Sequence, residues 1–492
     1  MKRYRLHIWP VWLLLGMMFL TACQNDALPE DTGSGKGGAV SAERYINLRI
    51  VGNSQAKTRA TFSDQATAAE NAVYDGILCI FEGNDETTAT LKTAVAIDQL
   101  INNPGSTANY QDLSITQRLA DGTHNYQNKL YVLVLLNTTS TGFKIGGTNN
   151  NELLFNGTSK KGCTISQIQQ LQISSVGSTD QHVGLFMSNA PQADCIMPEV
   201  TSTYLFDTEA AAAIGSRLTI NVERAAARVK VTNTASEVSS FYLDRDENRH
   251  PTVHKMTWAL HNYNEVSYAI RNGSTAANNW ATSVTGVNIP IAFDTTVPDI
   301  FDVYQQHSYK DGDDVYIAEN TTYEVNDQTQ VFVEVQLKDG SFLLGDCYRY
   351  RLWGADIFFT SADKFIQYCK DGWTSLFSGF YPALSSKSAE EIFKYTSLVI
   401  NDDGSVTVSI TNNSFTSTEQ EALATLSNTL SGHVDGIRVL TGYRDGKMYY
   451  TNKIKHDTDH EFGVVRNNAY NLNFTSVQRI GDPVPTPIIV TP

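Results

Sequence analysis

The sequence is short of charged residues and has no basic cluster beyond its first few positions. Charged side chains make up 18% of the 492 residues, below the roughly 25% of an average soluble domain. Acidic residues outnumber basic ones 52 to 37, which gives a formal net charge of −15. Because a protein that binds nucleic acid needs a basic face, this distribution disfavours nucleic acid as a partner.

Cysteine and proline are also scarce, with 6 and 13 residues. The five cysteines after Cys23 are widely spaced and include no C-x-x-C pair, which disfavours a disulfide framework and a zinc site. Cys79 lies in the apolar run 76–81 and is expected to be a small core residue. The chain is instead rich in serine, threonine, asparagine, tyrosine and valine. That composition is typical of an extracellular β-protein.

Motifs of the common enzyme classes are missing, since the chain contains no G-x-S-x-G, H-E-x-x-H, P-loop or G-x-G-x-x-G pattern. Two clusters hold metal-capable side chains, His-Asp-Thr-Asp-His at 456–460 and Asp-Gly-Asp-Asp at 311–314. The first lies between a predicted strand and a glycine, and the second lacks the ligand spacing of an EF-hand loop, so both favour turns. We therefore predict no enzyme activity, no metal site and no cofactor.

The N-terminus has the pattern of a secretory signal, with a basic start followed by the apolar stretch Trp9–Leu20. This stretch is short for a membrane span, which takes about 20 residues. It ends in Leu-Thr-Ala-Cys at 20–23, which resembles the lipobox of bacterial lipoproteins, in which the cysteine thiol is lipidated. We predict a lipoprotein signal peptide over 1–22, lipidation of Cys23 and a Gly-rich flexible tether over 23–43.

Alternating apolar residues begin at Tyr45–Val51, where Ile46, Leu48 and Ile50 share one face of a predicted half-buried strand. Further strands are predicted at 76–81, 130–136, 182–187, 217–222, 227–232, 255–260, 267–270, 315–318, 330–337, 397–400, 405–410, 448–453 and 470–474, and short helices at 67–71, 164–171, 361–369 and 416–430. Regular strand–helix alternation is absent. The pattern predicts a mainly β protein with two antiparallel β-sandwich domains, 44–223 and 224–492, and short helical insertions in the second.

Several segments, taken in their order along the chain, resemble one protein family. They are the lipobox at Cys23, the strand and arginine-containing loop at 45–60, and the motifs at 185–190, 222–229, 316–321, 449–450, 463–472 and 481–483. Together they resemble the fimbrillins, the major fimbrial subunits of the Bacteroidales. The C-terminal block resembles most closely the short-fimbria (minor-fimbria) branch.

This resemblance implies two transthyretin-like β-sandwich domains made as a lipoprotein and exported to the cell outer membrane. It further implies cleavage by an arginine-specific protease in the loop after the first strand, so that the first strand and its loop, 44–59, are removed. A neighbouring subunit's C-terminal segment then fills the groove, and the polymer is a fimbrium on the cell surface. The implied partners are other copies of the chain, accessory fimbrial subunits, the protease, the outer membrane through the lipid, and host or bacterial surface ligands.

The cleavage and donor residues follow from this scheme. Cleavage is expected between Arg59 and Ala60, in a polar loop that a protease can reach. The rival bond, Arg49–Ile50, lies inside the predicted strand. The expected donor strand consists of the alternating residues Val484, Thr486, Ile488 and Val490, which would replace Ile46, Leu48 and Ile50. Pro485 and Pro487 remove two backbone donors from one ladder.

Other interpretations of the sequence stay open. The chain would serve as an accessory tip or anchor subunit if it lacked a usable donor strand or a usable cleavage site. In an alternative from a different functional class, the chain is a surface lipoprotein that binds glycans through its sandwich loops. The frequent aromatic residues, 23 tyrosines and 21 phenylalanines, are compatible with that function, but they also serve β-sandwich cores.

Overall fold

The computed structural model describes most of the chain after residue 43. The described residues are 44–52, 66–97, 113–119, 128–179, 183–192, 195–236, 238–264, 266–271, 288–289, 308–322, 324–352, 355–434, 437–456 and 463–486. All of them belong to one compact unit, Ala42–Pro492. Within these residues, none of the helices combines the length and the hydropathy that a membrane span requires.

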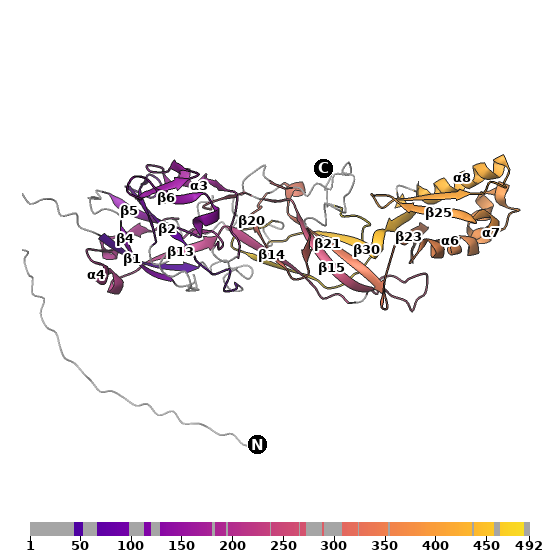
Figure 1. Cartoon of the computed structure of the whole chain (residues 1–492), viewed down its shortest axis with the longest axis horizontal. Coiled ribbons are helices and arrows are strands. Elements are labelled where there is room, and N and C mark those ends of the chain that lie inside the picture. Colours follow the sequence, from indigo (N-terminus) through magenta and orange to yellow (C-terminus); the bar gives the residue numbers. More distant parts are fainter. Residues whose placement is uncertain are drawn as a thin grey trace, which may run out of the picture. The chain divides into compact units, whose positions relative to one another are not determined.

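The first half of the described chain is built on one large sheet (Figure 1). Its strand order is β12-β1-β13-β10-β5-β2-β3, with β4 added on β1 and β11 added on β5. The strands are β1 (Arg44–Gly52), β2 (Gly76–Gly83), β3 (Thr90–Ala96), β4 (Leu113–Leu119), β5 (Lys129–Leu136), β10 (Met187–Asn189), β11 (Glu199–Val200), β12 (Leu205–Phe206) and β13 (Leu218–Arg224).

Alternation along these strands gives the sheet a core on each face. In β5, Val132 and Val134 lie in one cluster of buried residues, together with β1 and β13. Leu133 and Leu135 lie in the other cluster. This second core also includes residues of β6 (Phe143–Gly146) and β7 (Glu152–Phe155), which form a small sheet with the exposed β8 (Thr158–Ser159), and of helix α3 (Ile165–Gln169).

The second half contains two sheets packed face to face around a third core. One has the order β18-β16-β20-β14-β31, and the other has the order β19-β15-β21-β22 with β30 also paired to β21. Their strands are β14 (Ala226–Asn233), β15 (Thr252–His261), β16 (Tyr263–Asn264), β18 (Asn288–Ile289), β19 (Tyr309–Lys310), β20 (Asp314–Ala318), β21 (Gln330–Asp339), β22 (Phe342–Leu343), β30 (Lys447–Lys453) and β31 (Ala469–Phe474).

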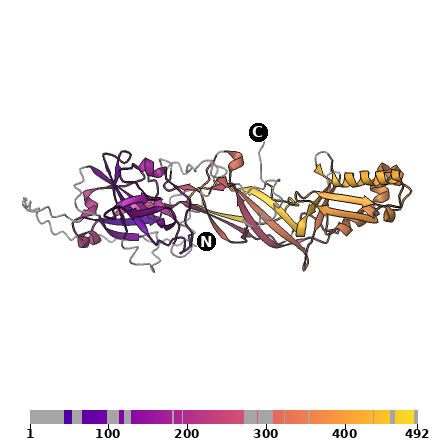
Figure 2. The same cartoon turned by 45° about the horizontal axis from the view of Figure 1, so that its top comes forward.

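Between β22 and β30 the chain forms an inserted α+β region with its own core. Figure 2 shows its helices lying beside short strands. It contains β23 (Cys347–Leu352), β24 (Ala355–Phe359), α6 (Ala362–Asp371), α7 (Ala389–Ile392), β25 (Tyr395–Ile400), β26 (Val406–Thr411), α8 (Ser417–Ser431), β27 (His433–Val434), β28 (Ile437–Arg438) and β29 (Leu440–Tyr443). Helix α8 begins with a capping box of Thr416 and Glu419, which satisfies the first free N–H groups of the helix.

The predicted fold class is confirmed, because the structure is mainly β with sandwich-like sheets. Most of the predicted strands are present, and Cys79 is fully buried. The predicted helix at 67–71 is wrong, because these residues form turns. The predicted strand at 182–187 is also wrong in its bounds, because the strand there begins only at Met187. The sequence-based prediction also missed β3 and β4. Their polar and small residues hide the alternation, and neighbouring strands decide their pairing.

Two strand pairs depart from the antiparallel pattern. β1 runs parallel to β13, and β14 runs parallel to β31. In each case a strand at the start of one half of the chain lies beside a strand at the end of the same half. Parallel neighbours need a long connection, and here the connection is nearly the whole of that half. The first strand is therefore held by a partner that follows it by more than a hundred residues.

Candidate functional site

The site expected from the sequence begins with β1, and its inward face is completely buried. Ile46, Leu48 and Ile50 are each 0% exposed and belong to the core shared with β5 and β13. The intervening Arg49 is exposed. The period-2 pattern of the sequence therefore corresponds to a real inward face.

β1 is a central strand with partners on both sides. β4 pairs with it antiparallel over Arg44–Ile50, and β13 pairs with it parallel over Leu48–Gly52. β12 adds a short antiparallel contact at Tyr45 and Ile46. In the described part of the chain, β4 has no other strand partner. Removing β1 would thus open a slot with unpaired backbone groups along both walls.

A helix closes the opposite face of β1 at its middle. Asn47 is 2% exposed, and its Nδ2 donates a hydrogen bond to the Gly215 carbonyl at 3.1 Å. Gly215 directly follows α4 (Glu209–Ile214), which contacts both β1 and β4. At this point β1 is therefore buried on both faces, so its pairing is shielded from water.

The predicted cleavage residues are only partly described. Arg49 lies opposite Ser114 of β4 and Thr219 of β13, so the rival bond to Ile50 lies inside two strand ladders. The bond between Arg59 and Ala60 lies outside the described residues, as does Cys23. The predictions of lipidation and of cleavage after Arg59 therefore stay predictions.

The C-terminal tail turns back along β30. Tyr449 and Asp482 exchange two backbone hydrogen bonds of 2.9 Å, and the Thr451 hydroxyl donates to the Thr486 carbonyl at 2.8 Å. Val484 is half-buried, Pro485 is buried and Thr486 is exposed. The other two expected donor residues, Ile488 and Val490, lie outside the described residues. The donor strand is thus neither confirmed nor contradicted.

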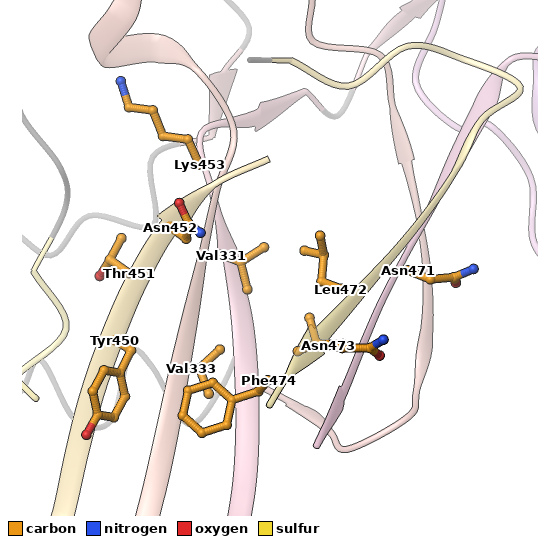
Figure 3. Close-up of a pocket in the computed structure, with 11 residues that line it drawn as sticks. Val331, Val333, Tyr450, Thr451, Asn452, Lys453, Asn471, Leu472, Asn473 and Phe474 are labelled. Atoms are coloured by element: carbon orange, nitrogen blue, oxygen red, sulfur yellow. The ribbon is translucent and has the colours of Figure 1, made fainter. Parts of the chain in front are cut away.

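A groove of about 360 Å³ lies next to this tail (Figure 3). Its walls are edge strands of the two packed sheets, β30 and β31, together with β14 and β21 behind them. Figure 3 shows Val331 and Val333 facing Leu472 and Phe474 across the opening. Lys453 lines the groove at the end of β30, and burial lowers the pKa of its amine. An apolar floor between two strand edges is suited to an extended apolar segment.

Three buried ion pairs connect the two halves of the chain or brace the strands near their junction. Arg466 and Glu319 form a bidentate pair with N–O distances of 2.6 and 2.8 Å, and Arg271 and Glu223 form another at 2.7 and 2.8 Å. The third pair joins Arg228 to Glu70 at 3.0 Å, and Tyr316 also donates to Glu70. The predicted domain boundary between residues 223 and 224 lies within the motif at 222–229, and the ion-pair partners of that motif were not predictable from its own residues.

The two candidate metal clusters gain no support. In the described part of the chain, no three histidine, cysteine or acidic side chains come close enough together to hold a metal ion. His456 is buried, and its Nδ1 lies 2.7 Å from the Tyr470 hydroxyl. The rest of that cluster, 457–460, lies outside the described residues. The five described cysteines are free.

Comparison with known proteins concerns the same C-terminal strands. Residues 441–489 match the family model "Major fimbrial subunit protein type IV, Fimbrillin, C-terminal". The matched segment contains β30, β31 and the described part of the tail. The resemblance to the fimbrillins is confirmed. Membership of the short-fimbria branch is not tested by this match and stays a prediction.

Solved structures similar to this fimbrillin-like chain include two fimbrial proteins. One is a fimbrilin from Porphyromonas gingivalis W83, with 11% identity, a TM-score of 0.37 and coverage of 89% of this chain and 92% of that chain. The other is a fimbrial assembly protein from Parabacteroides distasonis ATCC 8503, with 10% identity, a TM-score of 0.32 and coverage of 61% and 84%. Likeness at this level carries no argument about function. No curated protein matches the chain.

Proposed function

We propose that this chain is the repeating structural subunit of a cell-surface fimbria that supports adhesion. The precursor would be lipidated at Cys23, exported to the outer membrane and cleaved after Arg59, and it would then polymerise by donor-strand exchange. One observation carries the proposal: β1 is an N-terminal strand whose inward face is completely buried and which has a strand on each side. The segment that contains Arg59 follows β1 directly in the sequence.

Loss of such a strand creates a strong acceptor. Full burial of an Ile or Leu side chain is worth about 1.5–3 kcal/mol, so the slot left by Ile46, Leu48 and Ile50 offers about 5–9 kcal/mol to a matching segment. Each restored backbone hydrogen bond adds about 1 kcal/mol. Because β4 loses its only described strand partner when β1 leaves, an incoming strand would also restore the place of β4 in the sheet.

The C-terminal tail matches the slot in length and in period. β1 has nine residues, and 484–492 is also nine residues long, with apolar or β-branched residues at every second position. Pro485 and Pro487 lack N–H groups that would point toward the same neighbour. Because the slot has a strand on each side, the other ladder would keep all of its donors.

The test is deletion of residues 484–492. The truncated chain is expected to fold, to be cleaved and to accumulate as monomers, because its acceptor slot is intact and its donor is missing. Electron microscopy of cell-surface material would show no filaments of this subunit. A chain lacking only 491–492 serves as the control, and it should still polymerise. Filaments of normal length from the longer deletion would overturn the donor assignment.

A further inference from the structure

The inserted region contains a small two-stranded sheet, β25 paired with β26, whose two edges are treated differently. Figures 1 and 2 show α8 lying along this sheet. The N–H groups of Val408 and Ile410 on β26 donate to the hydroxyls of Ser431 and Ser427 of α8, at 2.8 and 3.0 Å. The edge of β26 is therefore closed by the helix.

In the part of the chain that the structure describes, no strand pairs with the other edge of β25. The Asn401 N–H donates to the Ser405 carbonyl at 2.8 Å, which fixes the alternation of the antiparallel ladder. Tyr395, Ser397 and Val399 then bond to β26, and the backbone groups of Thr396, Leu398 and Ile400 point outward. Arg444 donates to the Ile400 carbonyl at 3.1 Å. Among the described residues, the backbone N–H and C=O groups of Thr396 and Leu398 meet no partner on that side.

Within its own six residues, β25 also lacks the features that normally protect such an edge, although the exposed Lys394 directly precedes it and lies over the Tyr395 ring at 5.2 Å. Natural edge strands carry lysine, proline, a bulge or an inward-pointing charge. The segment Tyr395–Ile400 has no charged residue and no proline, and its register with β26 is unbroken. Tyr395 and Val399 are 55% and 57% exposed, on the same face as the exposed Ser397.

We propose that β25 pairs antiparallel with β25 of a second copy of this chain, about a two-fold axis at Ser397. Thr396 of one copy then lies opposite Leu398 of the other. The N–H and C=O groups of Thr396 and Leu398 in the two copies then form four hydrogen bonds, and Ile400 lies outside the paired residues. Tyr395 lies opposite Val399 of the second copy, which is an aromatic–β-branched pair of the kind that stabilises sheets. The contact between Arg444 and Ile400 stays intact.

The fit of the strand to its own copy favours a second copy as the occupant. The strand carries no charge, and the two-fold register gives each open N–H and C=O of Thr396 and Leu398 a partner on the other copy. The pairing is isologous and uses the outer edge of β25 in each copy, while α8 closes the edge of β26, so it stops at a pair. It is lateral and distinct from the end-to-end assembly proposed above. It does not depend on donor-strand exchange.

A disulfide test distinguishes this register from any other contact. At the axis, the two copies of residue 397 form a non-hydrogen-bonded pair with Cα atoms about 4.5 Å apart, within reach of a disulfide. Ser409 lies opposite Ser397 on β26, on the same exposed face. Its two copies would be three strand spacings apart, about 14 Å, which is too far.

The experiment uses the purified uncleaved full-length chain, so that failure of polymerisation cannot affect the result. After mild oxidation, most of the Ser397→Cys variant should run as a dimer on a non-reducing gel. Ser409→Cys and the unsubstituted chain, with its native cysteines, should remain monomers. A monomeric Ser397→Cys, or equal dimerisation of the two variants, would overturn the proposal.

A second pair of variants tests the contact without a covalent bond. Val399→Lys places two charges in the proposed interface and should weaken self-association by about tenfold in sedimentation equilibrium, because the substitution occurs twice in a symmetric pair. Thr407→Lys adds the same charge to the neighbouring strand at an exposed position opposite Val399, and it should leave association unchanged. Equal effects of the two variants would contradict the proposed pairing.

Discussion

Single side chains decide two features of this molecule, the anchoring of β1 and the junction of the two halves. Leu48 is 0% exposed at the centre of β1, so its methyl groups are completely buried in the core. Glu319 is 1% exposed and satisfies two nitrogens of Arg466. The first residue contributes burial of apolar area, and the second compensates a buried charge. The consequences of removing them differ accordingly.

Leu48→Ala should lower the free energy of unfolding of the precursor by about 2–5 kcal/mol, because it removes buried methyl groups and leaves a cavity. The neighbouring exposed Arg49→Ala should change it by less than about 0.5 kcal/mol. Urea denaturation of both precursors measures the difference. In assembled subunits that have lost residues 1–59, Leu48→Ala should have no effect. An equal destabilisation there would contradict removal of the strand.

Glu319→Ala should cost about 3–5 kcal/mol, since it leaves the guanidinium of Arg466 buried without its counter-charge. Asp356→Ala is the matched control, because it breaks the Arg351–Asp356 pair, whose side chains are 34% and 25% exposed. That partly solvated pair should be worth at most about 1 kcal/mol. Chemical denaturation of the two variants gives both values. Similar losses would show that burial does not control the strength of these pairs.

The pairing of the strands explains why the proposed exchange involves the first strand. β1 is parallel to β13 and antiparallel to β4, so it occupies a slot whose walls come from other parts of the chain. A replacement strand needs only the correct period and length, because the walls already exist. The described end of the tail, in contrast, is held on β30 by a single two-residue bridge and a few side-chain contacts.

Two adjacent substitutions test which face of the proposed donor strand points into the slot. Ile488→Asp should abolish polymerisation, because residue 488 would point into the apolar slot, where an unpaired carboxylate is strongly unfavourable. Ile489→Asp changes the neighbouring residue to the same side chain and should be tolerated, because residue 489 would point away. Counting filaments by electron microscopy compares the two variants. If Ile489→Asp is the more harmful, the tail binds with the opposite face inward.

The sequence predicted elements well where apolar alternation was regular. β1, β2, β5, β21 and α8 are all present close to their predicted bounds. Prediction failed where the decisive contacts come from elsewhere. β4 (LSITQRL) has few apolar residues, and it becomes a strand because β1 pairs with it along its whole length. The candidate site was therefore recognised by its inward residues, while one of its walls was missed.

At the scale of the whole molecule, maturation should turn a membrane-bound precursor into a polymerising subunit. Cys23 and the tether lie before β1 in the sequence, so one cut after Arg59 would remove the lipid anchor and the first strand together. This coupling follows from the order of the segments. It predicts that cleavage and release from the membrane occur in one step.

N-terminal sequencing of assembled material should give Ala60-Thr61-Phe62. Arg59→Ala should block maturation. The nearest preceding arginine, Arg49, cannot replace it, because it lies within two strand ladders where a protease has poor access. Arg49→Ala should be processed normally and serves as the control. Finding Ile50-Val51-Gly52 as the N-terminus would instead identify the rival bond.

Labelled palmitate should enter the precursor through Cys23 and be absent from Cys23→Ala. The substituted chain is also expected to lose its outer-membrane association, because the described residues contain no membrane-spanning helix and two or more acyl chains suffice for stable anchoring. Fractionation of labelled cells measures both properties. Unchanged labelling and membrane association of the variant would contradict lipidation at this cysteine.

The sequence by itself determined the mainly β class, the inward face of β1, and the resemblance to the fimbrillins, because each rests on local period or on short motifs. Only the tertiary structure decided that β1 is central, that β4 and β13 form its walls, and that Glu319 neutralises Arg466. These partners are separated by up to 170 residues along the chain. Local propensity carries no information about such pairings, which are decided by which surfaces can be buried together.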